Sequence, residues 1–165
     1  MTAVSSIQLR RPVWQATVML TLGFWLSCSL ILDWVILPSL YVSGMMTQAG
    51  FATAGYLIFW NFNRIELLSA ALVVTGMLVL GRTQFAATKW RHGAIVLSLL
   101  LLAVSLIDTY FLTPQMCATG LQLNLFESIA EIPGTMNQLH AGYCLLEVVK
   151  LVTGGALLGW CFRQQ

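Results

Sequence analysis

The feature that most constrains this chain is a run of twenty residues, Val13 to Leu32, without a single charged side chain. A helix over that run is about 30 Å long at 1.5 Å per residue, which matches the hydrocarbon core of a bilayer. Three other stretches are also long and apolar. They are Phe51 to Leu80, Gly93 to Leu112 and Leu139 to Phe162. The sequence therefore predicts four membrane-spanning helices.

The composition supports a membrane location. Hydrophobic residues make up 58% of the chain and charged residues 8%, whereas a soluble domain carries about a quarter charged residues. The net charge of +2 is small, and the basic residues form no stripe with aromatic residues, which excludes a nucleic-acid partner. We predict an integral, multi-pass membrane protein surrounded by the lipid bilayer.

The expected fold class is all-α, an integral membrane four-helix bundle that forms a single domain over residues 1–165. The predicted spans cover about residues 13–38, 53–80, 93–112 and 139–162. The polar stretch Asn61 to Glu66 predicts an interfacial turn, after which the second helix crosses as Ile65 to Leu80. Pro114 is expected to stop the third helix at Leu112, because proline lacks the amide hydrogen that a helix needs.

The connection between the third and fourth helices carries an amphipathic pattern. Apolar residues recur at helical spacing at Leu121, Leu125, Ile129 and Ile132. This pattern predicts a short interfacial helix between helices 3 and 4, lying on the membrane surface. A plain loop folded over the bundle is the alternative.

The basic residues that flank the predicted spans indicate an orientation. They are Arg10, Arg11, Arg82, Lys89, Arg91 and Arg163. With an even number of spans these residues all fall on one side, and Lys and Arg are enriched on the cytoplasmic side of membrane proteins. Both termini are therefore predicted to be cytoplasmic. The N-terminal apolar run is too long for a signal-peptide core and has no small-x-small cleavage pattern, so we expect it to be retained.

Several ionisable residues fall inside the predicted spans, where each costs roughly 2.5–3.5 kcal/mol to insert. At about 1.5 Å per residue, Glu66, Asp108 and Glu147 lie at one depth in the outer half of the membrane. Lys150 lies a turn lower and Asp33 lies near the outer rim. Lipid cannot solvate these groups, so they are expected to face the interior of the bundle.

The fourth helix collects polar residues on one face, because His140, Tyr143, Glu147 and Lys150 follow each other in steps of three or four. Arg64 lies at the edge of the same layer. The candidate buried polar cluster therefore consists of Asp33, Arg64, Glu66, Asp108, His140, Glu147 and Lys150.

Three interpretations of this cluster remain open. An ion-pair clasp would join Lys150 to one of the acids and Arg64 to Asp33 or Asp108, and would fix the register of the helices. The excess of acids over bases also fits a proton relay or cation site that opens outward. Chance placement near a water-filled interface is the third.

Soft-metal and haem sites have weaker support. The weak candidates for a copper site are Met116, Cys117, His140 and Cys144, because thioethers and thiolates suit Cu(I). His92 and His140 fall at opposite faces of the membrane and cannot bridge one haem iron. We expect no resident metal or cofactor. The sequence contains no catalytic motif, and enzyme activity is not indicated.

The order of several short motifs carries a resemblance. The motifs are "LPSLY" at Leu37 to Tyr41, "AGFATAGYLIFW" at Ala49 to Trp60, "DTYFLTPQM" at Asp108 to Met116 and "MNQLHAGYCLLE" at Met136 to Glu147. Over nearly its whole length the chain resembles an uncharacterised four-helix bacterial membrane family to which the human transmembrane protein 205 is related. The resemblance implies a fold and a membrane location. It also implies amides where Asp108 and Glu147 stand, so a function of that family need not transfer.

Two function classes follow. Small residues at Gly154, Gly155 and Gly159 allow another helix to approach closely, which favours an accessory or assembly subunit bound to a membrane-protein partner or to a second copy of the chain. The alternative is a small transporter or a proton or cation relay that uses the charged cluster. A copper-related role is a minor alternative.

Overall fold

The computed structural model describes residues 3–45, 50–83, 88–125 and 134–163. The described residues are almost entirely helical and contain no strand. In chain order the elements are α1 (Ala3–Ile31), η1 (Leu32–Ile36), α2 (Leu37–Val42), α3 (Phe51–Thr83), α4 (Thr88–Ile107), η3 (Asp108–Leu112), α5 (Thr113–Leu125) and α6 (Gly134–Arg163), where η marks a π-helical turn.

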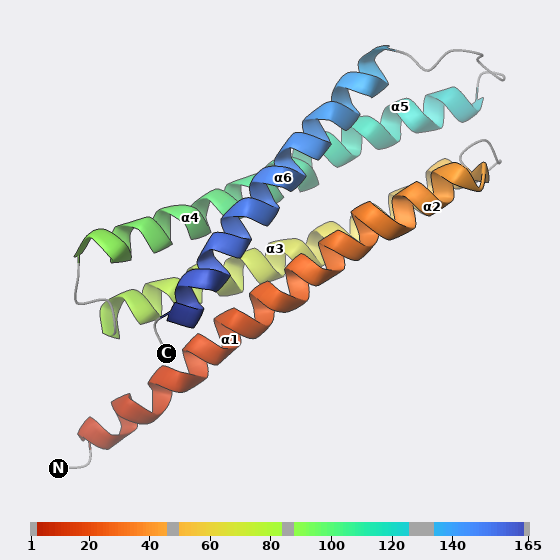
Figure 1. The fold of residues 1–165 in the computed structure, drawn as a ribbon. Coiled ribbons are helices and arrows are strands. Elements are labelled where there is room, and N and C mark those ends of the chain that lie inside the picture. Colours follow the sequence, from red (N-terminus) through yellow and green to blue (C-terminus); the bar gives the residue numbers. More distant parts are fainter. Residues whose placement is uncertain (1–2, 46–49, 84–87, 126–133, 164–165) are drawn as a thin grey trace.

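These elements join into four long helices within the described residues: α1–η1–α2, α3, α4–η3–α5 and α6 (Figure 1). Each helix contains a segment long and apolar enough to cross a membrane. The segments are Val13–Leu40, Thr53–Arg82, His92–Thr119 and Asn137–Arg163. The all-α four-helix bundle predicted from the sequence is confirmed, and the chain is a multi-pass membrane protein.

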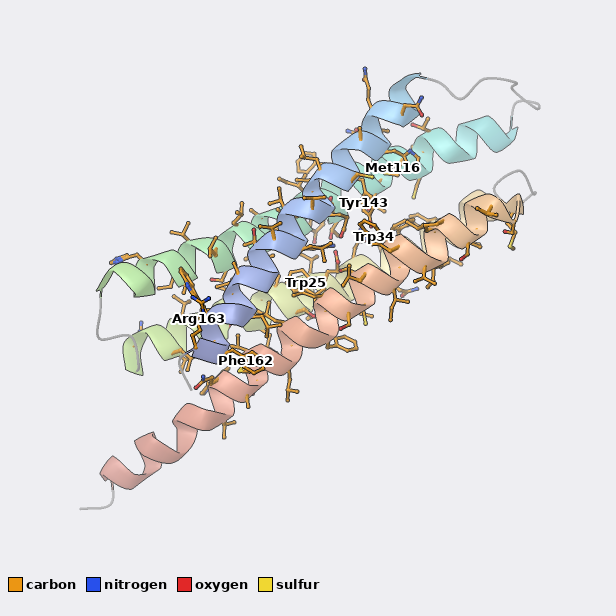
Figure 2. The ribbon with its side chains drawn as sticks, in the orientation of Figure 1. Trp25, Trp34, Met116, Tyr143, Phe162 and Arg163 are labelled. Carbon is orange, nitrogen blue, oxygen red and sulfur yellow. The ribbon has the colours of Figure 1, made fainter. Side chains whose placement is uncertain are left out.

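The two ends of the bundle can be told apart by the chain termini and by the basic residues that lie beside them. Phe162 and Arg163 lie at the end near both chain termini, which we call the terminal end, and Met116 lies toward the other, which we call the α2–α5 end (Figure 2). Arg82 and Arg163, in the last turns of α3 and α6, lie at the terminal end. The cytoplasmic location of that end stays a prediction from the positive-inside rule.

Two local expectations were wrong. The second helix has no interfacial turn at Asn61 to Glu66, because α3 runs unbroken from Phe51 to Thr83. The third helix does not stop at Leu112 but continues through Pro114 to Leu125. Leu121 to Leu125 thus form the end of the third long helix, and the rest of the predicted interfacial helix lies outside the described residues.

A wide turn explains how the third helix passes its proline. In η3 the amide of Thr113 donates to the carbonyl of Asp108, five residues back instead of four, and Pro114 follows directly. In η1 the amide of Leu37 donates to Leu32 in the same way, directly before Pro38. A proline ring clashes with the carbonyl one turn back in a regular α-helix, and the wider turn moves that carbonyl away.

The half of the bundle near the terminal end has an apolar core. Its fully buried side chains come from all four long helices and include Val18, Leu22, Val73, Met77, Leu101 and Leu157. Two glycines let helices approach closely there. A Cβ on Gly76 would lie 2.2 Å from Val18, and one on Gly154 would lie 2.8 Å from Leu26. Close contact at small residues is the usual way for helices to pack in lipid.

Candidate functional site

The other half of the bundle is centred on a buried lysine. The side chain of Lys150, on α6, is 0% exposed, and its ammonium forms salt bridges with Glu66 of α3 and with Glu147 one turn earlier on α6. Both glutamates are themselves buried. The helix register places Glu147 and Lys150 on one face, because residues three apart are neighbours on a helix surface.

Glu66 receives further hydrogen bonds from the first helix. The indole nitrogen of Trp25 donates to Glu66 Oε1 over 2.9 Å, and the hydroxyl of Ser29 donates to the same oxygen over 3.2 Å. Trp25, Ser29 and Asp33 are spaced four residues apart, so one face of α1–η1 carries all three. This spacing was visible in the sequence, but only Asp33 was included in the predicted cluster. The donors fix the orientation of the Glu66 carboxylate.

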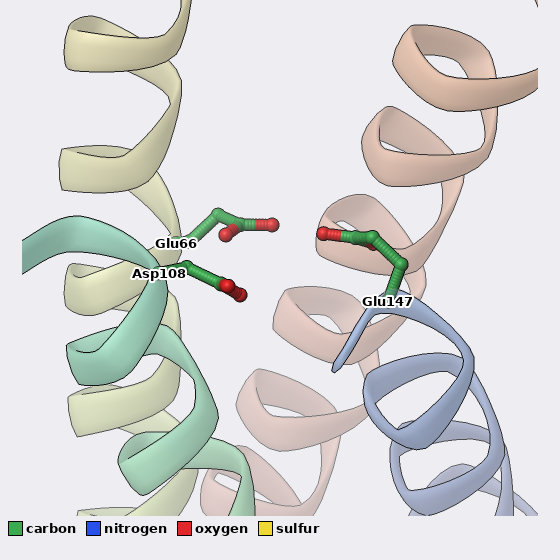
Figure 3. Close-up of side chains that lie close together, drawn as sticks. All are labelled: Glu66, Asp108 and Glu147. Carbon is green, nitrogen blue, oxygen red and sulfur yellow. The ribbon is translucent and has the colours of Figure 1, made fainter. Parts of the chain in front are cut away.

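Asp108 is the exceptional member of the site. It is 1% exposed, and neither carboxylate oxygen has a hydrogen-bond partner among the described residues. One oxygen from each of Glu66, Asp108 and Glu147 lies within 4.8 Å of the other two. Figure 3 shows Glu66 and Asp108 pointing from α3 and η3 toward Glu147 on α6. The π-helical turn η3 begins at Asp108.

Asp33 extends the site toward the α2–α5 end. The hydroxyl of Tyr143, on α6, donates to Asp33 Oδ1 over 2.7 Å. The second oxygen, Oδ2, is buried and has no partner in the described part of the chain. The ring of Tyr143 also packs edge-on against Phe59, with ring centroids 5.8 Å apart. Tyr143 therefore links the fourth helix to both the first and the second.

The charges of this site do not balance. Among the described residues it holds four carboxyl groups, those of Asp33, Glu66, Asp108 and Glu147, against the single ammonium of Lys150. Carboxylates a few ångströms apart in a low-dielectric interior repel one another strongly, and they cannot all stay ionised without further positive charge. An excess of acids of this kind favours the binding of protons or of a cation in addition to Lys150.

A metal ion is a poor fit to this centre. In the described residues, Glu66, Asp108 and Glu147 are the one group of three His, Cys or carboxylate side chains close enough to share an ion. Hard cations prefer such oxygen ligands. However, the Lys150 ammonium already contacts two of the three carboxylates, and it would repel a divalent ion at the same place. The donor set matches proton binding better.

The predicted copper ligands do not form a site of this kind. His140, Cys117 and Cys144 belong to no such group within the described ranges. The cysteines of the chain, Cys28, Cys117, Cys144 and Cys161, are free thiols. His140 is exposed, whereas Tyr143, Glu147 and Lys150 on the same helix are buried.

Arg64 does not join the cluster, and its expected pairing with Asp33 or Asp108 is wrong. The two salt bridges of the described residues both belong to Lys150. Arg64 is exposed, and its guanidinium lies 4.1 Å from the ring centroid of Trp60. Arg64 precedes Glu66 by two residues, which is about 200° around a helix, so the two side chains point to nearly opposite faces.

Fold and site together define a class: a multi-pass membrane protein with an acid-rich, lysine-centred site buried in one half of its helix bundle. Comparisons with protein-family models, with curated proteins and with solved structures find no match to this chain. Function therefore has to be argued from the site itself.

Proposed function

We propose that this protein binds a proton or small cation at the cluster of Glu66, Asp108, Glu147 and Lys150, and acts as a small transporter or relay for it. The observation that carries the proposal is Asp108, a buried carboxyl group with two unpartnered oxygens beside two other acids. Ionisable groups inside a membrane usually mark ion pathways or proton relays, because they are expensive to keep there.

A purely structural clasp explains the cluster less well. A clasp compensates the desolvation of each charge with a partner, as Lys150 does for Glu66 and Glu147. Asp108 receives no such compensation, and Glu147 Oε2 also lacks a partner among the described residues. An asparagine at 108 would fill the same volume without the charge. The acid at this position therefore supports a function that needs an ionisable group.

The residues divide into distinct roles under this proposal. Asp108 takes up and releases the proton or cation. Lys150 is the resident counter-charge that pairs with Glu66 and Glu147. Trp25 and Ser29 orient Glu66, because both donate to its Oε1.

Infrared spectroscopy of the full chain in lipid bilayers tests this proposal. A protonated carboxyl group shows a C=O stretching band separate from that of a carboxylate, and the band shifts in D₂O. We expect such a band at neutral pH in the parent protein and its loss in Asp108→Asn. Ser98→Ala, a buried substitution outside the cluster, is the matched control and should keep the band. If the parent shows no such band and binds no cation by elemental analysis, the cluster is an ion-pair clasp and the proposal is wrong.

An accessory role remains a second proposal, supported by one face of α6. Gly154 packs inward on Leu26, but a Cβ on Gly155 or Gly159 would meet nothing within 4 Å. These two positions leave room for a helix of a partner or of a second copy. Purification in mild detergent tests this role: a stoichiometric partner supports it, and a lone monomer contradicts it.

A further inference from the structure

A small cavity lies between α3 and the third long helix, and its lining includes the polar side chains of Asn63, Thr109 and Thr113. It has a volume of about 80 Å³. Its lining comprises Tyr56, Trp60, Asn63, Thr109, Thr113 and Pro114. The amide nitrogen of Asn63 donates to Thr113 Oγ1 over 2.7 Å across this interface. The hydroxyl and amide groups in this lining offer water the hydrogen-bond partners that a purely apolar cavity lacks.

The lining residues place the cavity next to the site and on its α2–α5 side. Thr109 directly follows Asp108. Asn63 precedes Glu66 by three residues, one helical turn nearer the start of α3. Thr113 opens α5, and Tyr56 lies two further turns from the acids. The cavity therefore extends from the acid layer toward the α2–α5 end of the bundle.

The charge of the neighbouring site discriminates between ligands. In volume open to the centre of a water molecule, one water needs about 10–15 Å³, so a cavity of about 80 Å³ has room for water. A metal ion that approached Asp108 would be repelled by the Lys150 ammonium, which contacts the adjacent carboxylates. A proton needs only a short file of waters.

We infer that the species bound at Asp108 is the proton, and that it arrives from the α2–α5 end through water held by Asn63, Thr109 and Thr113. This inference rests on the proposed function. A hydronium ion in the cavity gives its proton to a carboxylate oxygen of Asp108. One O–H bond breaks at the hydronium, one forms at the carboxyl group, and a neutral water remains.

The hydroxyl groups of the lining suit this role. Thr109 Oγ1 donates to the carbonyl of Ser105 over 2.7 Å and keeps lone pairs that can accept from water. Thr113 accepts from Asn63 and keeps a proton to donate. The groups that bias the proton on Asp108 come from every neighbouring long helix. They are Asp33 on η1, Glu66 on α3, and Tyr143, Glu147 and Lys150 on α6.

The test is the rate at which the Asp108 carboxyl band shifts after H₂O is replaced by D₂O. Thr109→Leu fills the cavity with an apolar side chain and should slow the exchange about tenfold or more, since water is excluded. Thr113→Val has nearly the same shape as the parent and should slow it too, by removing a hydroxyl group. The matched control is Thr17→Leu, which lies in a separate cavity lined by Val13, Trp14, Thr17 and Leu72 and should exchange at the parent rate.

The outcomes separate this inference from the proposed function. Absence of the band in the parent contradicts both. A band that exchanges equally fast in the parent and in both cavity variants leaves proton binding intact and refutes the route. Loss of the band on addition of Na⁺ or Ca²⁺, with about one ion bound per chain, shows that the species is a metal cation and refutes the inference that it is the proton.

Discussion

The two halves of this bundle are built on opposite principles. Toward the terminal end, residues such as Val18, Met77 and Leu101 form a close-packed apolar core with glycines at the tightest contacts. Toward the α2–α5 end, the same helices bury Glu66, Asp108 and other polar groups. The apolar half gains packing contacts without desolvation cost, whereas the polar half retains charges that are expensive to bury. The comparison indicates that close packing holds the helices together in one half, whereas the other half contains the ionisable groups on which the proposed function depends.

Backbone geometry follows the same division. Both π-helical turns lie in the polar half, and each contains an acid, Asp33 in η1 and Asp108 in η3. In the described residues the apolar half has regular α-helix throughout. π-helical turns inside long helices are frequent at functional sites, since the extra residue re-aims the side chains around it. The local distortion and the unpartnered carboxyl group thus coincide at Asp108.

Loss of the central lysine should have the largest effect on stability. Lys150→Met removes the ammonium that Glu66 and Glu147 share, which leaves buried carboxylates uncompensated and should lower the free energy of unfolding by about 3–5 kcal/mol. Thermal unfolding in detergent measures this. The triple variant with Glu66→Gln and Glu147→Gln should recover most of the loss. If Lys150→Met is as stable as the parent, the polar half is not held by this ion pair.

Glu147→Leu should cost less than Lys150→Met, because Lys150 keeps its second partner, Glu66. The difference in the free energy of unfolding between the two single variants therefore measures how much the remaining salt bridge between Lys150 and Glu66 contributes to stability. Equal losses would show that the two glutamates act as one unit.

Packing in the apolar half should be sensitive to single methyl groups. Gly76→Ala places a Cβ 2.2 Å from Val18 Cγ2 and should destabilise the protein by about 1–3 kcal/mol through overpacking. Adding Val18→Ala should relieve the clash. The control is Gly155→Ala, whose Cβ meets nothing within 4 Å, and it should unfold at the parent temperature or slightly above. A harmless Gly76→Ala would mean that the helices of this half are not in close contact.

The sequence predicts those parts of the fold and of the polar site that follow from regular helix geometry. It does not predict the parts that depend on a local distortion of a helix. The common depth of Glu66, Asp108 and Glu147 follows from counting residues along straight helices, and the structure places their oxygens together. The same counting explains the face shared by Glu147 and Lys150. The continuation past Pro114 was missed, because a proline in a sequence signals an end and the wide turn that accommodates it has no clear pattern.

Arg64 shows a different limit of sequence reasoning. Its place in the chain, two residues from Glu66, suggested membership of the cluster, yet that spacing turns the side chain to the outer face. The depth of each residue in the membrane predicts the layer of ionisable residues. The angle of each side chain around its helix determines which of them face the interior of the bundle. The hydrogen bond between Asn63 and Thr113 cannot be predicted from depth and helix angle alone, because it also depends on which long helices are neighbours.

Arg64→Leu should have a small effect, since the exposed guanidinium contributes through its contact with the Trp60 ring. A cation–π contact at an exposed site is worth about 0.5–1 kcal/mol. Chemical unfolding in detergent should therefore shift slightly, and the carboxyl band should be unchanged. A loss as large as that of Lys150→Met would place Arg64 in the buried network and contradict its assignment to the outer face.

Asp108→Asn should have the smallest effect on stability and the largest on function. The oxygens of Asp108 have no partner among the described residues, so an amide of the same shape loses no hydrogen bond and removes an ionisable group from the buried site. The free energy of unfolding should stay within about 1 kcal/mol of the parent value or rise. The infrared carboxyl band assigned to Asp108 should disappear in the same variant. If Asp108→Asn unfolds several kilocalories per mole more easily, Asp108 stabilises the ion-pair network, and the polar half differs from the apolar half only in the means by which it holds the helices together.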